Sequence, residues 1–131
     1  MWSAPLLIST DLRHLSEDKR RIITNKEVIA INQDRSATAG DRIWVGAHGE
    51  QVWSRPLFNG DVCVVLYNSG RNGTESRVVG VEWGMIEGWS SSTVVGVRDV
   101  WEQKEMGKFT GGLNATLKVK DVMMLRLTKV E

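Results

Sequence analysis

From about residue 40 onward, the chain repeats short segments in which apolar and polar residues alternate, separated by turns rich in glycine and asparagine. A period of two places successive side chains on opposite faces of a strand, so each segment predicts a half-buried β-strand. Seven segments follow this pattern, and they read RIWV, EQVWSRPL, DVCVVLYNS, SRVVGVEW, TVVGVRDVW, LNATLKV and VMMLRLT. Seven or eight short strands at this spacing predict an antiparallel β-sandwich with Greek-key connections.

Two connections between these segments suggest which strands are neighbours. In the last two segments, a turn at Lys120 and Asp121 joins LNATLKV to VMMLRLT, and we expect this pair to be adjacent. Upstream, Asn72-Gly73 lies between DVCVVLYNS and SRVVGVEW, and this dipeptide is a strong hairpin signal. Both pairs are therefore predicted to lie side by side in one sheet.

The first third of the chain has a different pattern. APLLIS is apolar without alternation, which is typical of a strand buried on both faces. Ser16 is expected to cap one helix, and Asn25 a second helix, KEVIAIN, whose apolar residues would be buried. A single strand followed by helices needs parallel neighbours, and nothing later in the chain supplies them. The first third is therefore interpreted as a piece of a larger domain, joined to the sandwich by the polar linker DRSATAGD, residues 34–41.

Composition excludes several classes of function. The chain has 131 residues, with 17 Lys plus Arg against 16 Asp plus Glu, so it has no charge excess for nucleic acid or an anionic membrane. It contains no apolar run of the roughly 18 residues that cross a bilayer. The single cysteine, Cys63, lies in an apolar strand and is expected to be a buried thiol. With only two histidines, His14 and His48, and no cysteine cluster, the sequence argues against a metal site, and no cofactor is expected.

The stretch STDLRHLS combines Asp11, Arg13 and His14 directly after the predicted buried strand. Barrel enzymes keep their catalytic groups at the C-terminal ends of the strands, which favours a catalytic site at these residues. The alternative is an ordinary polar loop in which the acid and the arginine pair with neighbours. No nucleophile adjoins His14, and Ser16 is better used as a helix cap, so the loop interpretation is preferred on the residues alone.

The predicted sandwich offers two further kinds of candidate. Glycoside hydrolysis needs two carboxyl groups facing each other across a sugar, and the carboxylates available in this half are Glu82, Glu87, Asp99, Glu102 and Glu105. Positions on strand surfaces and in loops are the preferred explanation of these carboxylates. Six tryptophans raise the alternative of a sugar-binding module, with Trp89 in a predicted loop as its candidate. Asn72 and Asn114 begin the tripeptides NGT and NAT, which are acceptors for N-glycosylation in a secreted protein.

Four motifs occur in a distinctive order: APLLISTDLRHLS, NKEVIAINQD, VRDVWEQKEMGKFTG and VMMLRLT. Together they resemble the C-terminal part of glycoside hydrolase family 27, the α-galactosidases and α-N-acetylgalactosaminidases. The resemblance implies a mainly β chain: residues 1–38 are the last strand, the helices and the linker of a truncated (β/α)8 barrel, and residues 39–131 are a C-terminal antiparallel sandwich. It also implies that residues 5–9 are the barrel strand.

The resemblance implies a function for a longer parent protein. The family cleaves terminal α-linked galactose, or its N-acetylamino analogue, with retention through two aspartates, and both motifs would lie upstream of this chain. No catalytic residue is therefore expected here, and Thr10, Asp11 and Arg13 become residues of the barrel mouth. The partner of the parent is an α-galactoside, and its compartment is expected to be lysosomal or extracellular. The alternative is a non-catalytic sugar-binding or scaffolding sandwich.

The division into two parts predicts how the chain behaves. Residues 39–131 are expected to fold alone, whereas APLLI and VIAI would face barrel elements that are not in the chain. Exposed apolar side chains favour folding back on the sandwich or forming a homodimer. On this view, deleting residues 1–38 leaves thermal stability nearly unchanged and makes the protein more monomeric.

Overall fold

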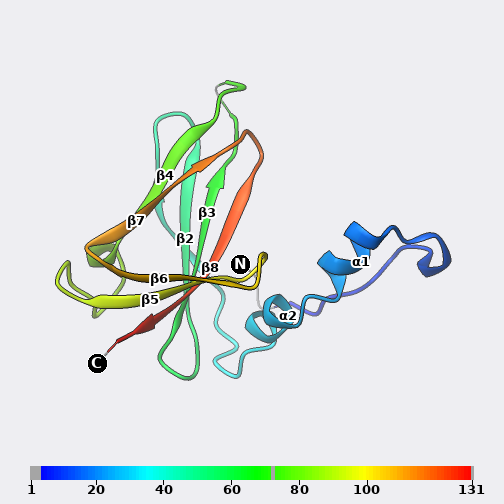
Figure 1. Ribbon diagram of the computed structural model, residues 1–131, viewed down its shortest axis with the longest axis horizontal. Helices are drawn as coiled ribbons and strands as arrows, with labels where there is room; N and C mark the ends of the chain where they lie inside the picture. Colours follow the sequence, from blue (N-terminus) through cyan, green and yellow to red (C-terminus); the bar gives the residue numbers. More distant parts are fainter. Residues whose placement is uncertain (1–3, 72, 131) are drawn as a thin grey trace.

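The computed structural model describes residues 4–71 and 73–130, in which a β-sandwich carries a helical segment on one side (Figure 1). The segment contains a short 3-10 helix and two α-helices, which are η1 (Leu12–His14), α1 (Glu17–Ile23) and α2 (Lys26–Asn32). The strands that follow are β1 (Asp41–Val45), β2 (Glu50–Pro56), β3 (Val62–Asn68), β4 (Arg77–Glu82), β5 (Val94–Asp99), β6 (Lys104–Thr110), β7 (Gly112–Leu117) and β8 (Val122–Lys129). A second 3-10 helix, η2 (Trp83–Met85), follows β4.

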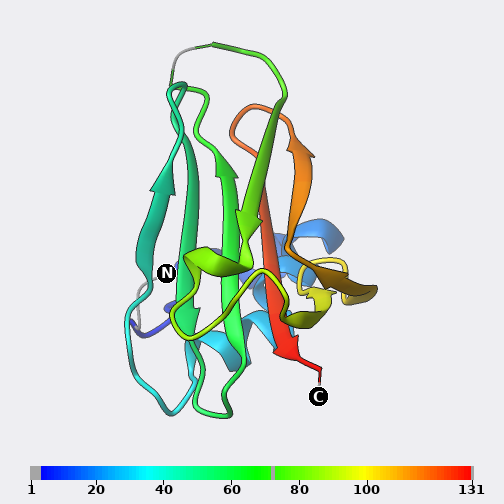
Figure 2. The ribbon, with the colours of Figure 1, turned by 90° about the vertical axis from the view of Figure 1, so that its left-hand side faces the viewer.

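The strands form two antiparallel sheets. The larger sheet has the order β1-β2-β3-β8-β5-β6, and the smaller sheet pairs β4 with β7. Figure 2 views the sandwich from the side opposite the helices, which lie behind it. The main core lies between the sheets, where Trp83 is fully buried and its indole N–H donates to the carbonyl of Phe109 at 3.4 Å. The predicted mainly β antiparallel sandwich is confirmed, and β8 lies between β3 and β5 in the non-sequential order of a Greek-key fold.

Both predicted strand pairs are wrong. β3 is a central strand whose edges are taken by β2 and β8, so the chain crosses to the other sheet before β4. Asn72 of the expected hairpin lies outside the described residues. The turn at Lys118–Asp121 is present, with the amide of Asp121 donating to the carbonyl of Lys118 at 3.1 Å, but β7 and β8 also belong to different sheets. Turn residues fix a local reversal, and they do not decide whether the next strand stays in the same sheet.

The two predicted helices form, and the expected residues cap them. Ser16 Oγ accepts from the amide of Lys19 at 3.5 Å, a long contact at an exposed position. Asn25 Oδ1 accepts from the amides of Glu27 and Val28 at 3.0 and 3.2 Å. The helices differ in packing, because α1 buries no residue whereas α2 buries Ile31.

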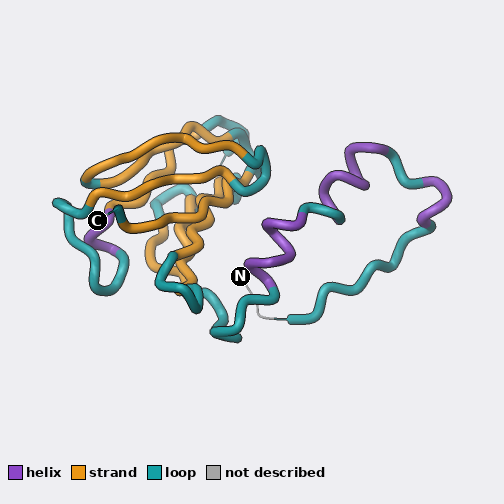
Figure 3. The backbone as a smooth tube through the Cα atoms, turned by 60° about the horizontal axis from the view of Figure 1, so that its bottom comes forward, coloured by secondary structure: helices purple, strands orange, loops and turns teal. Residues whose placement is uncertain are grey.

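The predicted strand at residues 5–9 does not form, and this segment is irregular. Its apolar side chains are exposed, with Leu6 at 57%, Leu7 at 89% and Ile8 at 57%. A parallel strand forms only where neighbouring strands share its backbone hydrogen bonds, and none of the described strands pairs with this segment. Figure 3 shows the result, an open loop that runs out from the sandwich and returns through the helices.

α2 packs against the outer face of the larger sheet and forms a second, smaller core there. Ile31 contacts a cluster with Leu57, Cys63 and Val100, and Val28 and Met124 pack beside it. The linker is also attached to the sandwich, because Asp34 Oδ1 accepts from the amide of Phe58 at 2.9 Å. The part of residues 1–38 that lies closest to the sandwich is therefore integrated with it, which argues against the expectation that the whole segment can be removed without effect.

Candidate functional site

Two of the residues predicted at the barrel mouth form one closed pair. Asp11 Oδ1 accepts from the backbone amide and from Nε of Arg13, both at 3.0 Å, and Oδ2 accepts from Nη2 at 2.9 Å. The same carboxylate caps η1. The hydrogen bonds from Arg13 hold the pKa of Asp11 below its ordinary value of 3.8. The pair therefore stabilises its own loop, and both side chains remain largely exposed at 44% and 84%.

The structure brings no second carboxylate to this pair. Thr10 and His14 are exposed beside it, and Ser16 is occupied at the start of α1. Within residues 4–71 and 73–130, the recorded ion pair of Asp11 is with Arg13 alone. Glycosidase chemistry needs two carboxyl groups held at a fixed separation. This loop therefore does not form a complete glycosidase site by itself.

The carboxylates of the sandwich have structural roles or lie on its surface. Asp99 is buried and accepts from the amides of Trp101 and Glu102 at 2.9 and 3.0 Å, so it holds the turn after β5. Glu105 is exposed and accepts from Arg98 at 3.1 Å. The remaining candidates, Glu82, Glu87 and Glu102, are exposed. No hydrogen bond or ion pair in the described chain joins two of these carboxylates to one site.

Trp89, the candidate for sugar stacking, is partly buried against the main core. Its ring meets that of Trp83 edge-on, with the centroids 6.3 Å apart, and Lys129 Nζ lies 5.4 Å from its centroid. Trp53 is similarly engaged, since its Nε1 donates to Gln51 at 2.9 Å. These contacts leave the two rings in structural positions rather than on an open aromatic platform.

The other sequence candidates lie as follows. Burial raises the pKa of the Cys63 thiol to about 12, as expected for an inert core cysteine. His48 is exposed in a turn, and the described residues contain no group of histidine, cysteine or acidic side chains suited to a metal. Asn114 is exposed on β7. Asn72 lies outside the described residues. No described helix is long and apolar enough to cross a membrane.

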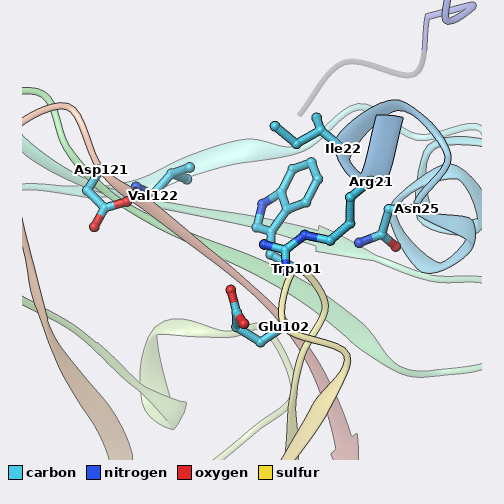
Figure 4. A pocket seen from close by; sticks show the side chains of 7 residues that line it. All are labelled: Arg21, Ile22, Asn25, Trp101, Glu102, Asp121 and Val122. Atoms are coloured by element: carbon cyan, nitrogen blue, oxygen red, sulfur yellow. Dashed lines mark hydrogen bonds between the residues drawn. The ribbon is translucent and has the colours of Figure 1, made fainter. Parts of the chain in front are cut away.

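A pocket that the sequence did not reveal lies between the helices and the sandwich. It has a volume of about 340 Å³, and Figure 4 shows Arg21, Ile22 and Asn25 on the helical side opposite Trp101 of the sandwich. Glu102, Asp121 and Val122 complete its lining. A second, more apolar pocket of about 310 Å³ shares Trp101 and Val122, and Arg55 lines it.

These pockets depend on contacts between distant parts of the chain, which a single sequence does not specify. Arg55 stands out among the lining residues as a charged residue inside the strand pattern VWSRPL, next to apolar positions. Its fractional exposure is 2%, so this charged side chain is buried.

Comparison with known proteins identifies the family. The model described as the alpha galactosidase C-terminal beta sandwich domain matches residues 47–127, and the model described as alpha galactosidase A matches residues 1–34. Alpha-galactosidase 3 of Arabidopsis thaliana is 35% identical over 98% of this chain and 29% of its own length. A probable alpha-galactosidase of Dictyostelium discoideum is 36% identical over 84% of this chain and 29% of its own length.

The fold comparison agrees with these relatives. Alpha-galactosidase I from Mortierella vinacea superposes with a TM-score of 0.87 and 30% identity, covering 96% of this chain and 32% of that enzyme. The chain thus spans about a third or less of the length of the relatives it matches. Since the sandwich model matches more than half of the chain, the chain belongs to the α-galactosidases of glycoside hydrolase family 27, as their C-terminal part with the β-sandwich domain.

Proposed function

We propose that this chain is part of a longer retaining glycoside hydrolase that releases terminal α-linked galactose from oligosaccharides or glycoconjugates. The observation that carries the proposal is the match of two consecutive α-galactosidase family models, at residues 1–34 and 47–127, in a chain that is 35% identical to an α-galactosidase over 98% of its length. Within such an enzyme, this chain supplies a non-catalytic sandwich and the segment that precedes it.

The chemistry of a retaining glycosidase explains why we assign no catalytic role to this chain. One carboxylate attacks the anomeric carbon while a second protonates the leaving group, and the two lie about 5.5 Å apart. The Asp11–Arg13 pair and the separated carboxylates of the sandwich do not supply this arrangement. We assign Thr10, Asp11 and Arg13 to the rim of the parent's site, and Asn72 and Asn114 to N-glycosylation if the parent is secreted.

We also propose residues 1–38 as the end of the barrel domain and residues 39–131 as the sandwich domain. The separate family-model matches on either side of residues 35–46 support this division. The contact between α2 and the sheet is then an interface between domains. Rigid attachment of this kind fits a sandwich that stabilises the position of the last barrel segment.

The test compares the 131-residue chain with the open reading frame extended upstream. We expect the extended protein to hydrolyse a chromogenic α-galactoside with retention, and the 131-residue chain to release nothing above buffer. A parallel assay on the N-acetyl-α-galactosaminide decides which of the two sugars is preferred. A folded extended protein that is inactive on both sugars would contradict the proposal, as would turnover by the 131-residue chain purified free of host glycosidases.

A further inference from the structure

Arg55 is a buried cation that forms no ion pair with any of residues 4–71 and 73–130. It lies on β2, opposite Cys63 of β3, on the face of the larger sheet that α2 covers. The residue is 2% exposed, and its Nε and Nη2 have no hydrogen-bond partner among the described residues. A guanidinium keeps its charge at all accessible pH values and offers five donors, so this arrangement is strongly unfavourable.

The other arginines on this face are satisfied. Arg126 Nε donates to Asp61 at 2.6 Å, and Arg98 donates to Glu27 from two nitrogens at 2.6 and 2.7 Å. Both of these arginines are therefore paired with acids. Arg55 is the exception among these three.

Asp34 does not neutralise Arg55. The positive charge of Arg55 acts on this carboxylate, but Asp34 Oδ1 accepts from the amides of Ser36 and Phe58, both at 2.9 Å. Neither Nε nor Nη2 of Arg55 donates a hydrogen bond to Asp34. Asp34 Oδ1 is thus used by the backbone of Ser36 and Phe58, and Nε and Nη2 of Arg55 remain without a hydrogen-bond acceptor.

The space beside Arg55 suits an apolar body with one acid. The pocket of about 310 Å³ that it lines is otherwise mostly apolar, and its walls include Leu6, Val28, Ile31, Val65, Val122 and Met124. Leu6 comes from the irregular N-terminal segment, in which Leu7 and Ile8 also remain exposed. The pocket and this exposed apolar row both belong to the side of the molecule where the N-terminal segment and the sandwich meet.

We propose that Arg55 is the receptor for an aspartate or glutamate side chain carried by an apolar segment of the parent polypeptide that precedes this chain. The inference rests on the proposed function, which supplies that polypeptide. Charge complementarity selects the acid, because a bidentate carboxylate satisfies two parallel N–H donors at once. The apolar lining of the pocket requires that the segment carrying this acid be apolar as well. Arg55 is thus the anchor that joins the sandwich to the rest of the enzyme.

The first test uses the 131-residue chain. Since Arg55 lacks its acid there, Arg55→Met removes an uncompensated charge and is expected to raise Tm by about 5 °C. Arg55→Lys keeps the charge and should not raise Tm. The matched control is Arg126→Met, which strips Asp61 of its partner and should lower Tm. A lower Tm for Arg55→Met, in a chain that still folds with native circular dichroism, would mean that Arg55 is already satisfied and would overturn the proposal.

The second test probes the chemistry directly. 3-Phenylpropionate, an apolar body with one carboxylate, should bind the 131-residue chain saturably and shift the amide resonances of β2 and α2. The uncharged 3-phenylpropionamide and the Arg55→Met variant should show no such shifts. Equal shifts from acid and amide would make the pocket merely apolar and would contradict the role of Arg55.

The third test identifies the source of the carboxylate in the extended protein. There the upstream acid is in place, so Arg55→Met should now lower Tm, opposite in sign to its effect in the 131-residue chain, while 3-phenylpropionate no longer binds. If Arg55→Met raises Tm in both proteins, or if the free acid still binds the extended protein, the occupant is not the upstream polypeptide. These readouts are independent of glycosidase turnover, so an inactive extended protein would refute the proposed function without deciding this question.

Discussion

Asn25 connects α2 to the sandwich with one side chain. Its Oδ1 caps α2 by accepting from the amides of Glu27 and Val28, and its Nδ2 donates to the carbonyl of Val100 in the sandwich at 3.0 Å. The residue is 4% exposed. Asn25→Ala removes the cap, worth about 1 kcal/mol, and leaves a buried carbonyl unpaired, at a cost of about 1–3 kcal/mol. We expect a total loss of about 2–4 kcal/mol in the free energy of unfolding, measured by urea denaturation.

The matched control for this variant is Ser16→Ala. Ser16 caps α1 through a single contact of 3.5 Å at an exposed position, and α1 buries no residue. Its removal should change the free energy of unfolding by about 0.5 kcal/mol or less. Equal losses for the two variants would show that the bond from Asn25 to the sandwich contributes nothing.

The ion pair between Glu27 and Arg98 predicts a dependence of stability on pH. The hydrogen bonds from Arg98 hold the pKa of Glu27 below its ordinary value of 4.5. A lowered pKa in the folded state stabilises the fold above pH 4.5, and this contribution is lost as the pH falls through the lowered value. Glu27→Gln should therefore destabilise the chain at pH 7 by about 1 kcal/mol, with the difference from the wild type vanishing in acid.

Urea denaturation at a series of pH values between 7 and 2 measures this difference. Glu17→Gln is the control, because Glu17 is 89% exposed and lies 3.9 Å from Arg20, a geometry that contributes little. A constant gap between the wild type and Glu27→Gln across the whole pH range would exclude the ion pair as its cause.

Some of these roles were predictable from the sequence. Ser16 and Asn25 were identified as caps because a polar residue before an apolar helical pattern is a local signal. The contact of Asn25 with Val100, and the burial of Arg55, arise between residues far apart in the chain. A periodic pattern reports which face a residue lies on, and it says nothing about what covers that face.

Because a periodic pattern reports only which face a residue lies on, it identified some strands and missed others. Seven strands followed the alternation of apolar and polar residues, whereas β6 escaped notice because all of its residues but Phe109 are exposed. It is an edge strand of the larger sheet and needs no apolar face. Sheet membership was also missed, since both predicted hairpins cross between sheets. The strand predicted at residues 5–9 does not form for a different reason, because none of the described strands pairs with it.

At the scale of the helices, two truncations separate what packs on the sandwich from what does not. Deleting residues 1–24 removes α1 and the irregular segment but keeps Asn25 and α2, so Tm should stay within about 2 °C of the intact chain. Deleting residues 1–38 also removes Ile31 and Val28 and uncovers Leu57, Cys63 and Val100. We expect this second truncation to lower Tm by about 5–10 °C while the main core between the sheets remains folded.

The two truncations are compared by thermal denaturation, together with Ile31→Ala in the intact chain. Ile31→Ala opens a cavity in the second core and should cost about 2–4 kcal/mol, which reproduces most of the loss from the longer truncation. An unchanged Tm after removal of residues 1–38 would restore the original expectation that the sandwich is independent of this whole segment.

For the molecule as a whole, the family was predictable, because four motifs in a distinctive order identify it. STDLR marked the loop in which Asp11 and Arg13 pair. The pocket beside Arg55 was not predictable, since its walls combine residues from the N-terminal segment, α2, β2, β3 and β8. A site built within one loop leaves a trace in the sequence, whereas a site built between distant segments becomes visible only in the fold.

The exposed apolar residues of the N-terminal segment predict self-association of the 131-residue chain. Leu6, Leu7, Ile8, Leu12 and Ile22 are each more than half exposed, and all precede α2. Burying one such side chain yields about 1.5–3 kcal/mol, while association costs about 4–15 kcal/mol in lost freedom, so several must be buried together. We therefore expect a reversible dimer, detected by sedimentation velocity over a range of concentrations.

Leu7 is the most exposed of these residues, at 89%, and Leu7→Ser should weaken the dimer by about tenfold or more. The control is Val78→Ser, because Val78 is 64% exposed on β4 of the smaller sheet, away from this segment. Its dimerisation constant should match that of the wild type. Removal of residues 1–24 should give a monomer that retains its thermal stability. If that truncated protein still dimerises, or if Val78→Ser dissociates the dimer, the sandwich and not the N-terminal segment forms the interface.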